Sequence, residues 1–184
     1  MTFSELKSYV LSDLHRYNPE ESGFLRLMLN VPGYRYSFLM RLAGYFKSRH
    51  DFLSVLPYVI IRFLLRRCEY KFGISIPYNT DIGHGLYIGH YGGIIINCKV
   101  IIGKNCNLNH EVTIGESFGG KNPGTPVIGD NVYIGPGAKI IGGISIGNNV
   151  AIGANCVVTK SIPDNSVVIG VPGRIISDKG SSDY

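Results

Sequence analysis

A six-residue periodicity in the hydrophobic positions dominates the chain between residues 82 and 159. An aliphatic residue recurs at this interval, a glycine usually follows it, and a small or β-branched residue usually lies two positions before it. Such a period is typical of a parallel β-helix, in which each hexad forms a short strand and a turn. Side chains two apart in a strand share a face, so both repeated positions should point inward. The aliphatic positions are Ile82, Ile88, Ile96, Ile102, Leu108, Ile114, Ile128, Ile134, Ile140, Ile146, Ile152 and Val158.

Two insertions interrupt the repeat. Two extra residues lie between Ile88 and Ile96, and eight lie between Ile114 and Ile128. Insertions in a repeat form loops, often on the binding face. We therefore expect residues 116–127 to form a loop over the site, near the histidines described below. With three hexads to a triangular coil, the repeat predicts about four coils. The short strands of a sandwich, which need a turn signal about every 8–12 residues, fit this spacing poorly.

The residues before the repeat carry a helical periodicity. Apolar residues recur at intervals of three and four, and Thr2 with Glu5 fits a capping box at the start of the first helix. Asn18-Pro19 should end that helix. The predicted helices cover approximately residues 2–17, 23–29, 34–49 and 56–72.

These patterns together predict an α+β protein. A helical region over residues 1–73 precedes a β-helix domain with a closing segment over residues 74–176, and a loose polar tail follows over residues 177–184. The β-helix is thus C-terminal, and the helices form a cap on its N-terminal side.

The apolar stretch at residues 52–67 has two interpretations. It contains Arg62 and ends in Arg66-Arg67, and it is too short to span a bilayer comfortably. It could lie in a membrane interface with its basic residues at the headgroups. Packing against the β-helix or another subunit is the interpretation we favour.

Composition narrows the class of protein. The chain has 184 residues, 45% of them apolar, which suits one domain or a solenoid with a cap. The net charge of +5 comes without a nucleic-acid-binding motif, so we expect no nucleic-acid partner. Cys106 and Cys156 fall on inward positions of the repeat, where a reduced thiol acts as a small apolar group. Without a signal peptide, a cytoplasmic protein is expected, with peripheral contact at the inner membrane face as the variant.

Two histidines are the candidate chemical groups. His90 and His110 each lie two residues after an aliphatic position, and they are 20 residues apart. This separation equals one 18-residue coil plus the two-residue insertion, so the imidazoles should lie on one edge of adjacent coils. Chance placement of polar residues at exposed corners is the alternative.

The hexads resemble those of the hexapeptide-repeat acyltransferases, whose coils form a left-handed parallel β-helix. Residues 14–19 and 32–34 resemble the helical region of the serine acetyltransferases. Residues 89–93 and 109–115 resemble more closely the colanic-acid and capsular polysaccharide O-acetyltransferases. Residues 169–175 are similar to the family's closing motif, with Gly173 in place of Ala.

This resemblance implies a mechanism. The acyl donor would be acetyl-CoA, no metal would be needed, and His90 would be the general base. A hydroxyl is a poor nucleophile at neutral pH and needs a base within hydrogen-bond distance, a role that suits the histidine pKa. His110 could instead be the base or bind the acceptor, and Glu111 is a candidate for orienting His90.

The resemblance also implies how coenzyme A would bind. In the family it lies along the coils between two subunits, and one prism face alone could not enclose so large a ligand, so we expect a homotrimer. The matching positions in this chain are Gly135, Gly153 and Ala154 for the pantetheine arm, and Lys160 and Arg174 for the nucleotide end.

The expected acceptor follows from departures from the serine acetyltransferase pattern. Asn18 and Gly89 stand where that family usually has Asp, and Thr125 stands where it has His. These positions therefore offer no anionic partner for a serine ammonium. We expect an acetyl-CoA-dependent O-acetyltransferase acting on a sugar hydroxyl of a polysaccharide or its precursor. Serine O-acetyltransferase, of cysteine biosynthesis, is the alternative, and a non-catalytic scaffold is the third interpretation.

Overall fold

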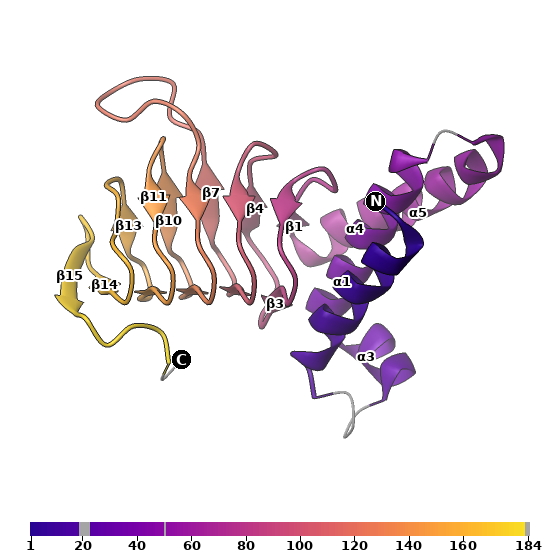
Figure 1. The fold of residues 1–184 in the computed structure, drawn as a ribbon, viewed down its shortest axis with the longest axis horizontal. Coiled ribbons are helices and arrows are strands. Elements are labelled where there is room, and N and C mark those ends of the chain that lie inside the picture. The colour runs from indigo at the N-terminus through magenta and orange to yellow at the C-terminus, as the bar shows by residue number, and fades with distance from the viewer. Residues whose placement is uncertain (19–22, 50, 183–184) are drawn as a thin grey trace.

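The computed structural model describes residues 1–18, 23–49 and 51–182. The molecule is elongated, with α-helices at one end and a column of stacked strands at the other (Figure 1). After the last strand, the chain turns back beneath the column (Figure 1).

Helices account for most of the described residues up to Phe72. The capping box at Thr2 and Glu5 is present, with both of its hydrogen bonds. Pro32 lies in the first turn of its helix, and Gly73 ends the last helix in the left-handed conformation at φ +62°. Each predicted helix begins and ends within two residues of an observed one. The helices are α1 (Phe3–His15), α3 (Phe24–Asn30), α4 (Pro32–Ser48), the 3₁₀ helix η1 (Phe52–Ser54) and α5 (Val55–Phe72).

The strands form three parallel sheets, and each strand pairs with the strand one coil later. Sheet A has the order β1-β4-β7-β10-β13, sheet B has β2-β5-β8-β11, and sheet C has β3-β6-β9-β12-β14-β15. Only β15 runs antiparallel to its neighbour, β14. The strands are β1 (Ile74–Ser75), β2 (Asp81–Ile82), β3 (Tyr87–Ile88), β4 (Ile94–Ile96), β5 (Ile101–Ile102), β6 (Asn107–Leu108), β7 (Thr113–Gly115), β8 (Val127–Ile128), β9 (Tyr133–Ile134), β10 (Lys139–Ile141), β11 (Ser145–Ile146), β12 (Ala151–Ile152), β13 (Val157–Val158), β14 (Val167–Ile169) and β15 (Arg174–Ser177).

The interior of the column is the hydrophobic core that the hexads predict. All twelve repeated aliphatic side chains are buried, and none is more than 3% exposed. Cys106 and Cys156 are also fully buried, and burial raises the pKa of the Cys106 thiol to about 12. The predicted inward positions are therefore confirmed. The handedness of the coils stays a prediction.

The first coil has no preceding coil to pair with, and side chains from the N-terminal helical region take that place on all three sheets, through two tyrosines and an arginine. At the first strand of sheet A, the Tyr36 hydroxyl donates to the Ile76 carbonyl at 2.9 Å and accepts from the Ile76 N–H at 3.0 Å. At the first strand of sheet C, the Tyr17 hydroxyl donates to the Ile88 carbonyl at 3.3 Å and accepts from the Ile88 N–H at 2.8 Å. Each phenol thus satisfies both backbone groups of one residue, which would otherwise be left unpaired.

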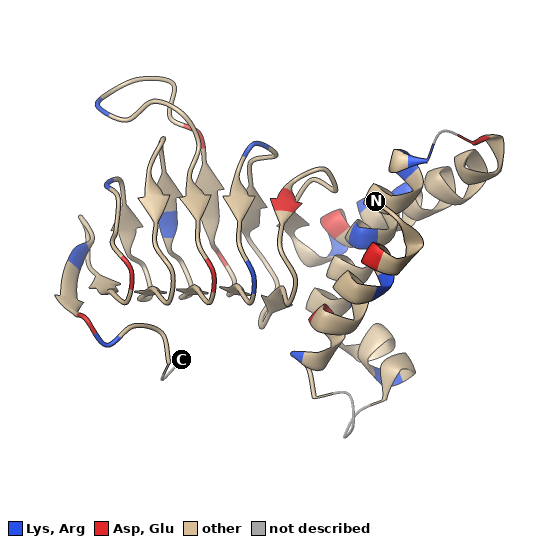
Figure 2. Cartoon of the chain, in the orientation of Figure 1, with Lys and Arg blue, Asp and Glu red and all other residues tan. Residues whose placement is uncertain are grey.

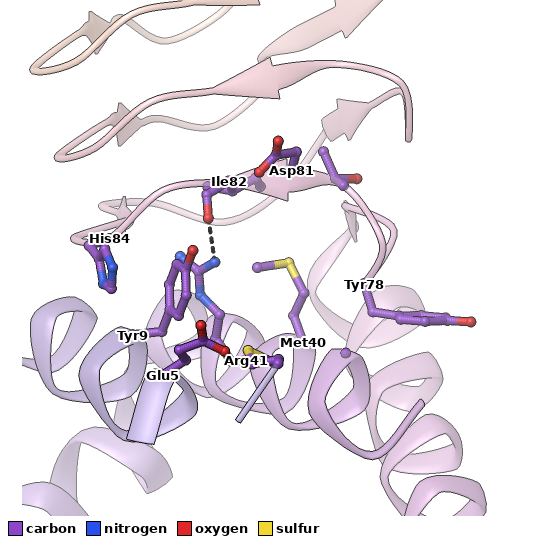
Figure 3. Close-up of a pocket in the computed structure, with 11 residues that line it drawn as sticks. Glu5, Tyr9, Met40, Arg41, Tyr78, Asp81, Ile82 and His84 are labelled. Carbon is purple, nitrogen blue, oxygen red and sulfur yellow. Dashed lines mark hydrogen bonds between the residues drawn. The ribbon is translucent and has the colours of Figure 1, made fainter. Parts of the chain in front are cut away.

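At the first strand of sheet B, the guanidinium of Arg41 pairs with backbone carbonyl groups in the same way. It donates to the Ile82 carbonyl at 2.6 Å (Figure 3) and to the Gly83 carbonyl, also at 2.6 Å. It also pairs with the buried Asp13 carboxylate at 3.0 Å, which in turn accepts the Leu86 N–H at 2.8 Å. Burial raises the pKa of Asp13, and Arg41 opposes this shift. We call this arrangement the Asp13–Arg41 clamp.

The turns that lead from sheet B to sheet C carry a ladder of asparagine amides. Neighbouring amides are hydrogen-bonded at 3.0–3.1 Å, and the residues adopt the left-handed backbone that asparagine tolerates. The tail expected to be loose runs across this ladder as far as it is described. Ser181 donates to the Asn131 carbonyl at 2.6 Å, and Gly180 is buried. The ladder consists of Asn105, Asn131, Asn149 and Asn165.

The clamp gives a stability prediction. Replacing Arg41 by Ala should lower the free energy of unfolding by about 3–5 kcal/mol, because the Asp13 carboxylate stays buried without its partner. Exposed Arg26 provides the matched control, and its replacement by Ala should change stability by no more than about 0.5 kcal/mol. Urea denaturation followed by circular dichroism measures both. Equal midpoints for the two variants would contradict the assigned role.

Candidate active site

His90 and His110 lie on one edge of the column. They follow β3 and β6, which pair with Ile88 opposite Leu108. Their ring centroids are 5.7 Å apart, with an edge-to-face angle of 79°. The predicted juxtaposition is therefore confirmed. His90 is exposed, whereas His110 is half-buried, and its Nδ1 has no hydrogen-bond partner among the described residues.

The turn that carries His90 stacks on the turn that carries His110. Gly92 and Gly93 have positive φ angles of +105° and +67°, which the two-residue insertion uses to fold the turn. The Glu111 N–H donates to the Gly92 carbonyl at 2.7 Å. A Cβ atom on Gly93 would lie 3.1 Å from Glu111 Cα, so a larger residue there would push the two turns apart. Glycine therefore allows the two histidines to come close.

Glu111 lies beside the histidines without contacting their nitrogens. Its side chain is exposed, and no ion pair or hydrogen bond joins its carboxylate to either imidazole in the described part of the chain. Its own backbone has a left-handed φ of +59°. The Lys139 ammonium donates to the Glu111 carbonyl, so a cation and a carboxylate flank the same turn. The expectation that Glu111 orients His90 stays a prediction.

Four of the five residues expected to bind coenzyme A continue the histidine edge. Gly135 and Gly153 follow β9 and β12, which are later strands of sheet C, and Ala154 comes next. Arg174 begins β15, opposite Ile169 at the end of the same sheet. A Cβ on Gly135 would lie 2.8 Å from the Ile152 carbonyl oxygen, so coil stacking alone already requires that glycine, whereas a Cβ on Gly153 would lie 2.8 Å from a methyl group of Ile169.

Lys160 lies at a different corner. It follows β13 and is therefore at the far end of sheet A from the histidine edge. There it lines a hollow of about 320 Å³ with Lys121, Ile141 and Thr159. Within one chain, the five predicted contacts thus do not form a single surface.

The expected position of the loop at residues 116–127 is wrong within one chain. The loop leaves the end of β7, whereas His110 precedes the start of that strand, and it projects from sheet A as the largest excursion of the column (Figure 1). Asn122 ties it to the later coils, through its amide to the Thr159 carbonyl at 3.1 Å and its carbonyl to the Gly143 N–H at 2.9 Å. The hexad spacing correctly predicts the residue at which the loop begins, but not the edge of the column from which it projects.

A second hollow of about 340 Å³ lies where α1 and α4 meet the first coil (Figure 3). His84 stacks on Tyr9 with centroids 4.0 Å apart, and Tyr9 also faces the Arg41 guanidinium at 4.5 Å. The sequence contained no signal for this cluster, because its members come from three segments. The Thr80 hydroxyl in this hollow is buried without a partner among the described residues. In the same residues, no group of three His, Cys, Asp or Glu could hold a metal ion.

Comparisons with known proteins identify the relatives. The family model "Bacterial transferase hexapeptide (six repeats)" matches residues 125–160. The serine acetyltransferase of Staphylococcus xylosus is 38% identical over 131 residues, which is 71% of this chain and 61% of that protein. The serine acetyltransferase of Synechococcus elongatus is 33% identical over 165 residues, 89% of this chain and 64% of that protein. The chain thus spans less than two thirds of the length of these relatives.

Solved structures agree with this relationship. Serine acetyltransferase from Brucella abortus superposes with a TM-score of 0.78 at 28% identity, covering 98% of this chain and 72% of that one. The Neisseria gonorrhoeae enzyme, solved in complex with serine, superposes with a TM-score of 0.73 at 27% identity, covering 95% and 70% of the two chains. The similarity therefore includes the helices as well as the column.

The expected sugar acceptor is overturned by these findings. The relatives and structures named above are serine acetyltransferases, and the closer local resemblance to polysaccharide O-acetyltransferases finds no support. The differences from the serine acetyltransferase pattern at Asn18, Gly89 and Thr125 do not outweigh the similarity to serine acetyltransferases along nearly the whole chain. The chain belongs to the bacterial hexapeptide-repeat transferases, and serine acetyltransferases are among its homologues.

Proposed function

We propose that this protein is a serine O-acetyltransferase that uses acetyl-CoA as the acyl donor. The observation that carries the proposal is the exposed His90 on an edge of the column, in a chain that aligns over 89% of its length with a serine acetyltransferase. The same edge carries Gly135, Gly153 and Ala154 on the later coils, which leave room for an extended ligand beside the column. A solved homologue in complex with serine supports the acceptor.

His90 is the general base in this proposal. Its imidazole removes the proton from the serine hydroxyl as the oxygen attacks the thioester carbonyl. The tetrahedral intermediate is stabilised by a backbone N–H of Gly92 or Gly93. When the C–S bond breaks, the proton passes from His90 to the leaving thiolate. His110, edge-to-face with His90, provides a second polar wall for the acceptor.

The acceptor's charges have candidate partners at the same turn. Glu111 is exposed beside the histidines, and its carboxylate can bind the serine ammonium. The Lys139 ammonium, already in contact with the Glu111 carbonyl, can meet the serine carboxylate. Glu111 thus supplies a carboxylate that Asn18 and Gly89 do not. A neutral sugar would use neither charge.

Coenzyme A is proposed to lie between subunits of a homotrimer. Gly135, Gly153 and Ala154 would line the pantetheine arm on the histidine edge, and Arg174 would lie at the end of that edge. Lys160 is at another corner of the same chain, so it is proposed to reach the nucleotide end from a neighbouring subunit. The loop at residues 116–127 lies at the Lys160 corner and would reach the neighbour in the same way.

The first test is the loss of the base. His90→Ala should lower kcat for acetyl transfer to serine by about 10²- to 10⁴-fold. Exposed His15 provides the control, and His15→Ala should keep the wild-type rate. Thiol release from acetyl-CoA, with serine as acceptor, measures both. Near-native turnover in a folded His90→Ala variant would contradict the assignment, and a loss confined to His110→Ala would move the base to His110.

The second test concerns the charge of the acceptor. Glu111→Gln should raise the KM for serine by about 10- to 100-fold, because one charge-assisted hydrogen bond is lost, and should leave the KM for acetyl-CoA unchanged. Glu69→Gln, which alters a carboxylate on α5, is the control. Steady-state kinetics with each substrate varied in turn gives both constants. An unchanged KM for serine would remove Glu111 from the proposed site.

The third test concerns assembly. Static light scattering coupled to size exclusion should give three times the mass of one chain at micromolar concentration. A monomer with full acetyltransferase activity would contradict a site shared between subunits.

A further inference from the structure

Helix α5 is apolar on two opposite faces. One face, which includes Leu65, Cys68 and Phe72, is buried against the rest of the protein. The other face is exposed, whereas a surface helix normally turns polar residues to water. Phe52 and Leu53 of η1 extend this surface and are 89% and 83% exposed. We call the exposed set the α5 stripe, which consists of Phe52, Leu53, Val55, Leu56, Val59, Ile60, Phe63 and Leu64.

The stripe is continuous and lies at one end of the molecule. Its helical members recur at intervals of one and three residues, which places them along one side of α5. Leu56 is 68% exposed and Phe63 is 60% exposed, so the face is open along its length. η1 and the start of α5 lie at the end of the molecule remote from β15 (Figure 1). An apolar patch of this kind marks an interaction surface.

Most of the chain's net positive charge lies in the segment that carries this stripe. Residues 47–71 contain six Lys or Arg and two acidic residues, a net charge of +4 out of +5 for the whole chain. Both acidic residues are in ion pairs, Asp51 with Arg49 at 2.7 Å and Glu69 with Arg62 at 3.9 Å. Lys and Arg occur along this helical end (Figure 2). The remaining cations are Lys47, Arg66, Arg67 and Lys71.

These cations border the apolar side chains directly. The Arg67 guanidinium lies 5.8 Å from the Phe63 ring centroid, at the C-terminal end of the stripe. The Lys47 ammonium lies 5.5 Å from the Tyr58 ring centroid, near the N-terminal end. Between Lys47 and Val59 there is a hollow of about 400 Å³, with a largely apolar lining. Each end of the stripe thus combines apolar surface with positive charge.

We propose that the α5 stripe docks on an anionic lipid surface. The apolar side chains would enter the boundary between headgroups and acyl chains, and the bordering Lys and Arg would meet the lipid phosphates. The helix would lie in the plane of the surface, since no helix in the described residues is long and apolar enough to cross a membrane.

Charge favours a lipid surface over a second copy of this chain. Among the described residues, cations without an ion-pair partner lie at both ends of the stripe, with Lys47 at one end and Arg66 and Arg67 at the other. Pairing two stripes, whether parallel or antiparallel, would bring like charges together, which disfavours the contact. An anionic surface satisfies both ends at once.

The test is co-sedimentation with lipid vesicles. The wild-type protein should bind vesicles containing phosphatidylglycerol and phosphatidylcholine at least tenfold more tightly than vesicles of phosphatidylcholine alone, and high salt should weaken this binding. The variant Leu56→Glu/Phe63→Glu should lose at least tenfold in affinity for the anionic vesicles. Ile176→Glu alters a side chain that is also 60% exposed, but on β15, and should bind as the wild type does.

Two results would overturn the proposal. One is a wild-type protein that stays in the supernatant with both vesicle types. The other is equal binding by the double variant and by Ile176→Glu. Light scattering of the protein without vesicles tests the competing occupant. If the wild type does not bind vesicles, and its mass exceeds that of a trimer and falls in Leu56→Glu/Phe63→Glu, the stripe is assigned to a second copy. Circular dichroism confirms that the variants are folded.

Discussion

The open end of the coiled column determines how the helices and the first coil fit together. A β-helix satisfies the backbone of each coil with the next, so its first coil presents unpaired N–H and C=O groups on three sheets. Tyr36, Arg41 and Tyr17 bind these groups, one on each sheet. The N-terminal helical region therefore does more than cover apolar surface, because its side chains provide the hydrogen bonds that a preceding coil would otherwise make.

The same contacts position the candidate site. Tyr17 holds both backbone groups of Ile88, two residues before His90. Gly33 on α4 lies so close to this strand that a Cβ there would be 2.2 Å from the Ile88 carbonyl oxygen. The turn that carries His90 is thus fixed from the helical side and from the next coil, where Glu111 bonds to Gly92. The backbone that carries His90 is therefore held in a defined position, which the proposed general base would need.

The charged groups proposed to bind the acceptor come from two separate segments of the chain. Asn18 and Gly89 lack the carboxylates that a serine ammonium would need, and this absence pointed to a neutral sugar. The structure places Glu111 and Lys139 at the same turn, although they are 28 residues apart in the sequence. Charge can therefore be supplied from a neighbouring coil, and the loss of one residue from a motif does not establish the loss of its function.

Regular spacing accounts for the features that could be predicted from the amino-acid sequence. The hexads specify the buried positions, the boundaries of the helices depend on their caps and periodicity, and the separation of His90 and His110 places them on one edge. All of these reflect local geometry repeated along the chain. Folding in three dimensions was needed to reveal the Asp13–Arg41 clamp, the corner from which the loop at residues 116–127 projects, and the exposed face of α5. These features join segments without a shared period, and a helix that is apolar on two faces has the same sequence whichever face is left open.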